Sequence, residues 1–111
     1  MRITIIIRTR FEAIHSWPNC PYEDVTFLRN PHRHEFWVEV EIEVSHNDRE
    51  IEFIKAKREL DRFLAGVYGK DLGSKSCEDI AENIMNSGMF WQVQSVTVLE
   101  DGENGAKISK E

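Results

Sequence analysis

Two segments near the start of the chain alternate between apolar and polar side chains, with the two-residue period of a strand that buries one face. In residues 1–15 the apolar face contains Ile3, Ile5, Ile7, Phe11, Ala13 and finally His15. In residues 34–44 the even positions are apolar and the odd positions are mostly acidic, so we expect Glu39, Glu41 and Glu43 to face solvent. We therefore predict two strands, paired antiparallel.

Further along the chain the apolar spacing changes to three and four residues, which is typical of helices with one buried face. This spacing predicts helices over 54–67 and 77–87, with Gly66 and Gly69 marking the end of the first. Ser76 and Asp79 resemble a capping box before the second helix, and Gly88 suits a left-handed stop after it.

The Val-rich segment 91–100 predicts a third strand, and 106–108 predicts a short edge strand within a turn-rich tail. The order strand, strand, helix, helix, strand, strand (ββααββ) predicts an α+β domain, with two helices on one face of a four-stranded antiparallel sheet. Residues 45–48 read as a turn, which leaves His46 exposed.

Residues 16–31 contain Pro18, Pro21 and Pro31, so this segment cannot be one regular element throughout. Long loops inside compact domains tend to be functional. Because this loop connects the first two strands at the end where candidate ligands gather, we expect it to line a site.

Length and charge narrow the classes of partner. The 111 residues suit one small domain, 1–111, and its limited size favours a homo-oligomer. The net charge is −6 and no basic cluster occurs, which disfavours nucleic acid and anionic membranes as partners. Cys20 and Cys77 form no CxxC pair, and 5–7 is too short an apolar run for a signal or a membrane span, so we expect a cytoplasmic protein.

Three histidines fall where the two predicted strands meet. His15 ends the apolar face of the first strand, and His32 and His34 share the parity of the apolar face of the second. Neutral imidazole is a common zinc ligand, and three of them leave a fourth tetrahedral position open. A histidine on an apolar face is also commonly a hydrogen-bonded, half-buried residue, so the residues alone leave both interpretations open.

Five short segments, in order along the chain, resemble one enzyme family. They are Phe-Glu-Ala-Ile-His at 11–15, His-Arg-His at 32–34 (with Arg33 where the family has glycine), Glu-Phe at 52–53, Ser-Cys-Glu-Asp-Ile-Ala at 76–81 and Val-Thr-Val-Leu-Glu at 96–100. They are similar to motifs of the 6-pyruvoyl-tetrahydropterin and 6-carboxy-tetrahydropterin synthases.

The resemblance implies the tunnelling fold, in which sheets of several subunits join edge to edge into a barrel, with active sites between subunits of a trimer or hexamer. It implies zinc on the three histidines and a lyase-like reaction on a dihydropterin, in tetrahydropterin or queuosine biosynthesis. Glu100 would anchor the flat ring, with Ser76 and Cys77 nearby; without the resemblance, Glu100 is equally an exposed carboxylate at a strand end. Cys77 begins a helix, where the dipole can lower a thiol pKa, although most such cysteines simply pack.

The sequence departs from the family at the proton-transfer groups. The synthases have a cysteine shortly before the His-x-His motif and an Asp-His pair between the helices. Here residues 26–28 are Thr, Phe and Leu in the first place, and no histidine follows Asn47. Cys20 lies further upstream in the same loop and is our candidate for the catalytic group.

Three explanations for this departure remain open. Cys20, or an acid such as Glu23 or Asp24, folds back to the metal and restores base chemistry. Alternatively, the pocket serves another zinc-assisted reaction, such as hydrolysis or aldol cleavage. In the third, the protein is an inactive relative that binds a pterin or purine, or an assembly subunit. We favour an enzyme, because a degenerate protein has little reason to keep three convergent histidines and Glu100.

Overall fold

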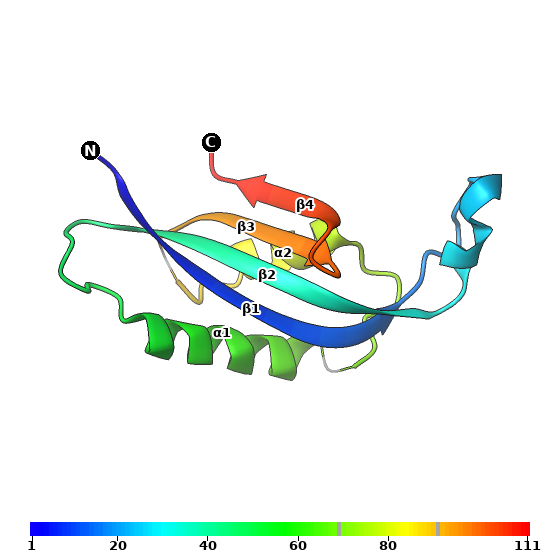
Figure 1. Cartoon of the computed structure of the whole chain (residues 1–111), viewed down its shortest axis with the longest axis horizontal. Helices are drawn as coiled ribbons and strands as arrows, with labels where there is room; N and C mark the ends of the chain where they lie inside the picture. The colour runs from blue at the N-terminus through cyan, green and yellow to red at the C-terminus, as the bar shows by residue number, and fades with distance from the viewer. Residues whose placement is uncertain (69, 91) are drawn as a thin grey trace.

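A computed structural model describes residues 1–68, 70–90 and 92–111. Its elements, in chain order, are β1 (Ile3–His15), the 3-10 helix η1 (Glu23–Arg29), β2 (His32–Val44), α1 (Phe53–Val67), α2 (Cys77–Met85), β3 (Val93–Glu100) and β4 (Asn104–Ser109) (Figure 1). The predicted order of strands and helices is confirmed. Two predicted positions, Gly69 after the first helix and Trp91 at the start of the third strand, lie outside the described residues.

The four strands form one antiparallel sheet in the order β1-β2-β3-β4. The long strands β1 and β2 run side by side along the molecule (Figure 1) and pair over their full length, from Ile3 opposite Val44 to His15 opposite His32. The register shifts between β2 and β3 at Glu41/Ile42. This pairing places the last residue of β1 directly beside the first residue of β2.

Both helices bury their apolar stripes in one continuous core on the same face of the sheet. Helix α1 packs against β1, and α2 packs against β3 and β4. The side chains that are almost fully buried include Phe36, Val38, Val40, Ile42, Leu60, Ile80, Val96 and Val98. The alternation that predicted the strands therefore points its apolar positions into this core.

The ends of the helices follow from local chemistry. The Glu52 carboxylate caps α1 by accepting hydrogen bonds from the backbone N–H groups of Ile54 and Lys55. The predicted capping box of α2 is confirmed: the Ser76 hydroxyl and the Asp79 side chain each bond the other residue's backbone N–H, at 3.0 Å. Helix α2 ends at Met85, two residues earlier than expected.

The opposite face of the sheet carries the acidic stripe of β2, as predicted, but its carboxylates are not simply solvated. Each one pairs with a cation from another part of the sheet: Arg2 just before β1, Arg8 on β1, or Lys107 on β4, two strands away from β2. The pairs are Arg2–Glu43 at 3.2 Å, Arg8–Glu39 at 2.8 Å and Lys107–Glu41 at 3.1 Å. These contacts require the strand order, which the stripe alone does not reveal.

The loop 16–31 projects beyond the ends of β1 and β2 and contains η1 (Figure 1). As expected, it is not regular throughout, because the backbone inside η1 is non-helical at Val25. In the described part of the chain, no helix is both long and apolar enough to cross a membrane.

Candidate metal centre

His15, His32 and His34 converge at the rim of the sheet, where β1 ends and β2 begins. Their ring centroids are 4.6 Å apart for His15 and His32, 5.3 Å for His15 and His34, and 5.0 Å for His32 and His34. One ligand nitrogen from each ring lies within 4.8 Å of the others. The convergence expected from strand parity is confirmed, and it follows from the register that sets His15 opposite His32.

Each imidazole faces a hydrogen-bond acceptor through its Nδ1 atom. The acceptors are the carbonyl oxygens of Lys75 for His15 (2.9 Å) and of Asn30 for His32 (2.8 Å), and the Asp101 carboxylate for His34 (2.7 Å). A carbonyl or carboxylate oxygen only accepts, so in each neutral ring Nδ1 must carry the hydrogen and donate it. The lone pairs of all three rings therefore lie on Nε2.

The Nε2 atoms of His15 and His34 are buried and have no hydrogen-bond partner among the described residues. The nearest polar group is the Glu100 carboxylate, with oxygens 3.0 Å from His15 Nε2 and 3.7 Å from His34 Nε2. Although the 3.0 Å contact is close, it does not have the geometry of a hydrogen bond. Lone pairs and a carboxylate thus meet with no donor between them, an arrangement that a cation would stabilise.

This donor set fits a metal ion. Histidines that ligate metals almost always donate their other ring N–H to a carbonyl, a carboxylate or water, and all three rings do so here. Ligands of one tetrahedral zinc ion lie roughly 3.3 Å apart, so the rings would draw somewhat closer around an ion.

Beside the histidines lies a cavity of about 570 Å³. It is lined by the expected ring-binding residues Glu100, Ser76 and Cys77, together with His15 and His32. Trp17 and Leu28 also line it, so the loop 16–31 contributes to the wall as predicted. The ends of β1, β2 and β3 and the start of α2 therefore meet around one space.

Cys77 begins α2, but the helix dipole does not leave its thiol with a lowered pKa. Burial raises the pKa of this thiol to about 12, and the negative charges of Glu100 and Glu78 add to the effect. Only 6% of Cys77 is exposed. In this environment the cysteine packs as a small apolar residue and is not poised as a thiolate.

Cys20 does not line the cavity in this structure. It is 2% exposed, and its Sγ faces the carbonyl oxygens of Tyr22 (4.0 Å) and Val25 (3.8 Å) inside the loop. Glu23 and Asp24 are exposed on η1 and are likewise absent from the cavity wall. The structure therefore gathers the three histidines, Glu100, Ser76 and Cys77, and leaves the candidate catalytic cysteine apart from them.

Sequence reasoning missed Asp101, which lies in the turn between β3 and β4 and bonds His34. Hydrogen bonds from the backbone N–H of Glu35 and from His34 hold the pKa of Asp101 below its usual range. The Asp-Gly pair at 101–102 was a recognisable turn pattern. The pattern does not reveal that this turn lies beside the start of β2.

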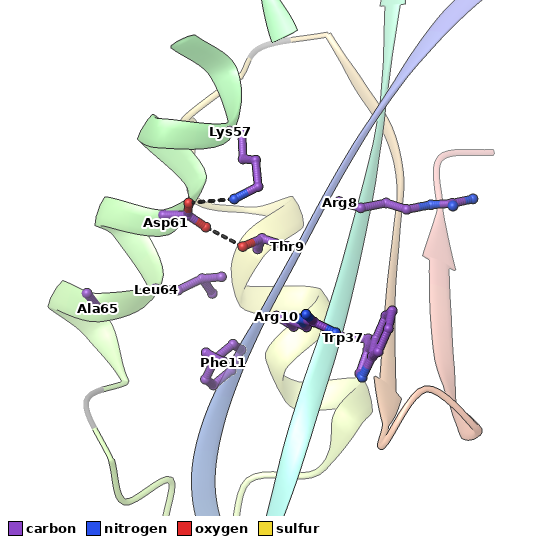
Figure 2. Close-up of a pocket in the computed structure, with 9 residues that line it drawn as sticks. All are labelled: Arg8, Thr9, Arg10, Phe11, Trp37, Lys57, Asp61, Leu64 and Ala65. Carbon is purple, nitrogen blue, oxygen red and sulfur yellow. Dashed lines mark hydrogen bonds and ion pairs between the residues drawn. The ribbon is translucent and has the colours of Figure 1, made fainter. Parts of the chain in front are cut away.

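A larger cavity, of about 790 Å³, lies along β1 and α1 (Figure 2). Asp61 of α1 binds both Lys57, at 3.0 Å, and the Thr9 hydroxyl of β1. The guanidinium of Arg10 stacks on Trp37 at 5.0 Å. The polar side chains that line this larger cavity thus already have partners. We therefore place the candidate site at the smaller cavity, where ligand atoms converge.

No family model and no curated protein matches the sequence. The structure, by contrast, is similar to that of Caenorhabditis elegans 6-pyruvoyl tetrahydropterin synthase, with a TM-score of 0.79 and 15% identity over 100% of this chain and 97% of that chain. It is also similar to an uncharacterized protein from Wolinella succinogenes, with a TM-score of 0.70 and 14% identity over 100% of this chain and 99% of the other. The chain therefore has the fold of 6-pyruvoyl tetrahydropterin synthase, as the resemblance implied.

Proposed function

We propose that residues 1–111 form a single, divergent domain of the tetrahydropterin synthase family, acting as a zinc-dependent, lyase-like enzyme on a dihydropterin. The observation that carries the proposal is the set of three histidines beside a cavity, each bonded through Nδ1, whose ligand nitrogens lie within 4.8 Å of one another. The shared fold and the five motifs in family order support the substrate class. The histidine cluster, the fold and the sequence motifs are three different kinds of support.

His15, His32 and His34 would hold the metal through Nε2. When bound, zinc would act as a Lewis acid that lowers the pKa of a substrate hydroxyl or polarises a carbonyl. Glu100 would accept hydrogen bonds from the guanidine-like edge of the ring, a charge-assisted contact that fixes its orientation. Ser76, half-buried in the cavity wall, and the apolar Cys77 beside it would contact the same ring.

We propose Cys20 as the catalytic group, which requires the loop 16–31 to rearrange. The thiol now lies within the loop, and Arg29 Nε donates to the Cys20 carbonyl oxygen at 2.9 Å. Freeing Cys20 would disrupt that packing. This requirement makes the base the part of the proposal that an experiment should test first.

One observation favours a second candidate, an inactive pterin- or purine-binding or assembly protein that keeps its zinc. Neither cysteine offers a reactive thiol to the cavity: Cys20 is buried in the loop, and the pKa of Cys77 is raised to about 12. In either case we propose a cytoplasmic homo-oligomer, a trimer or hexamer, because the fold of this small domain is shared with a synthase.

The test is to load the protein with zinc, add dihydroneopterin triphosphate and identify products by mass spectrometry. For the enzyme, we expect turnover that is lost in Cys20→Ala. Turnover retained in that variant would remove Cys20 from the mechanism. No turnover at full zinc occupancy would favour the binding protein.

Binding of the pterin ring is measured separately, by titration calorimetry with dihydroneopterin. Loss of a hydrogen bond to a charged group costs about 1.5–3 kcal/mol, so Glu100→Gln should weaken binding by roughly 10- to 150-fold. Glu78→Gln is the matched control, because Glu78 is an exposed acid on the wall of the same cavity. Equal binding by both variants would contradict the role of Glu100.

A further inference from the structure

Asp101 occupies the turn after Glu100 in a left-handed conformation, with φ of 56°, followed by Gly102 with φ of 72°. Its carboxylate reaches across to β2, where one oxygen accepts from His34 Nδ1 at 2.7 Å and the other from the backbone N–H of Glu35 at 2.9 Å. The Asp101 backbone N–H in turn donates to the Glu35 carbonyl oxygen at 2.7 Å. Two hydrogen bonds therefore fix the side chain of Asp101, and a third fixes its backbone.

Asp101 differs from the other groups that hold the histidine rings. His15 and His32 donate to backbone carbonyl oxygens, so their orientation depends on the main chain alone. His34 is held by a side chain, and by one that carries a negative charge. A carboxylate bonded to a histidine fixes the tautomer of the ring and makes its other nitrogen a stronger donor to a metal.

We propose that Asp101 is the positioning residue of the metal centre: it holds His34 in the Nδ1–H form, so that His34 presents the lone pair of Nε2 to the ion. The inference rests on the proposed metal site and adds a residue that the family resemblance did not supply. Since the Nε2 of His34 is buried without a hydrogen-bond partner among the described residues, the lone pair has no competing protein donor there.

The geometry makes Asp101→Asn a sharp test, because an amide has one acceptor where the carboxylate has two. If the amide oxygen keeps the bond from the Glu35 N–H, the NH₂ group faces His34 Nδ1 and must donate to it. The ring hydrogen then moves to Nε2, where it blocks the metal. In the opposite orientation of the amide, two donors, the NH₂ group and the Glu35 N–H, would face each other without an acceptor. Asparagine also tolerates the left-handed conformation, so the turn itself should persist.

The experiment measures zinc affinity by competition with a chelator, and the tautomer of His34 by ¹⁵N NMR of the metal-free protein at a pH where the rings are neutral. Asp101→Asn should bind zinc about 10- to 100-fold more weakly, the usual effect of losing an outer-shell partner. Its His34 ring should change from the Nδ1–H to the Nε2–H form. Glu103→Gln removes the same charge from the same turn at an exposed position and should change neither result.

An Asp101→Asn variant with wild-type zinc affinity, or with an unchanged His34 tautomer, would overturn the inference. A weakening that Glu103→Gln reproduced would show that only the charge near the site matters, which also overturns it. If the wild-type protein bound no zinc, the proposed function would fail. The tautomer of His34 in the metal-free protein would still support or overturn the proposal that Asp101 holds this ring in the Nδ1–H form.

Discussion

Two of the cavities that border β1 differ in how their polar groups are matched. In the larger one, of about 790 Å³, Asp61 joins Thr9 to Lys57, so donors and acceptors are paired. In the smaller one, of about 570 Å³, the buried Nε2 atoms of His15 and His34 have no hydrogen-bond partner among the described residues. Unmatched buried acceptors are costly in a folded protein unless a ligand or an ion satisfies them. The candidate site is therefore identified by its unmatched ligand atoms and not by its volume.

The largest expected effect comes from removing one metal ligand. His32→Ala should weaken zinc binding by more than the about 10- to 100-fold that loss of an outer-shell partner causes, because two imidazoles cannot complete the site. At a zinc concentration of 100 times the Kd, wild-type protein should gain about 2.7 kcal/mol of stability, visible as a rise in Tm that the variant lacks. Chelator competition and thermal unfolding measure the two effects.

His46→Ala is the matched control, since His46 is an exposed histidine of the turn after β2, with no part in the cluster. It should bind zinc as the wild type does. Comparable losses in the two variants would mean that the three convergent histidines are not the zinc site.

The next largest effect is expected from a substitution in the larger cavity. Asp61→Ala removes the hydrogen bond from Thr9 and an ion pair with Lys57 in which both side chains are about half exposed. An exposed ion pair contributes little, so we expect a loss of about 1 kcal/mol, mostly from the hydrogen bond, and unchanged zinc affinity. Denaturant unfolding and chelator competition provide the readouts, with the exposed acid Glu59→Ala of α1 as control. A change in zinc affinity would show that the two cavities are coupled.

The smallest expected effect concerns the pKa of Cys77, which lines the smaller cavity. Its pKa is raised in the folded protein from 9.0 to about 12, so the folded state keeps a proton that the unfolded state releases. The resulting stability is fully present below pH 9 and is lost as the pH rises toward 12. Wild-type protein should therefore lose roughly 0.4 kcal/mol of stability relative to Cys77→Ala as the pH rises from about 8 to about 9. Parallel pH profiles for the two proteins would show that the thiol titrates normally.

Local patterns were sufficient to predict most of the fold. Two-residue alternation identified β1 and β2, and the spacing around Leu60 and Ile80 identified the buried faces of α1 and α2. The capping box at Ser76 was also readable, because its hydrogen bonds join residues three apart. Within the site, the parity of His15 and His32 was enough to predict that they meet once β1 and β2 pair.

The strands, the helices and the convergence of the histidines could thus be predicted from the sequence, since each depends on periodicity or on pairing between consecutive strands. The remaining features depend on contacts that form when distant segments pack. Asp101 reaches His34 across 67 positions of sequence, and the Lys75 carbonyl reaches His15 across 60. The pKa of Cys77 followed from burial, which outweighed the helix end that the sequence displays. Contacts between distant segments and the loss of solvent around a group arise only when the sheet and helices pack together.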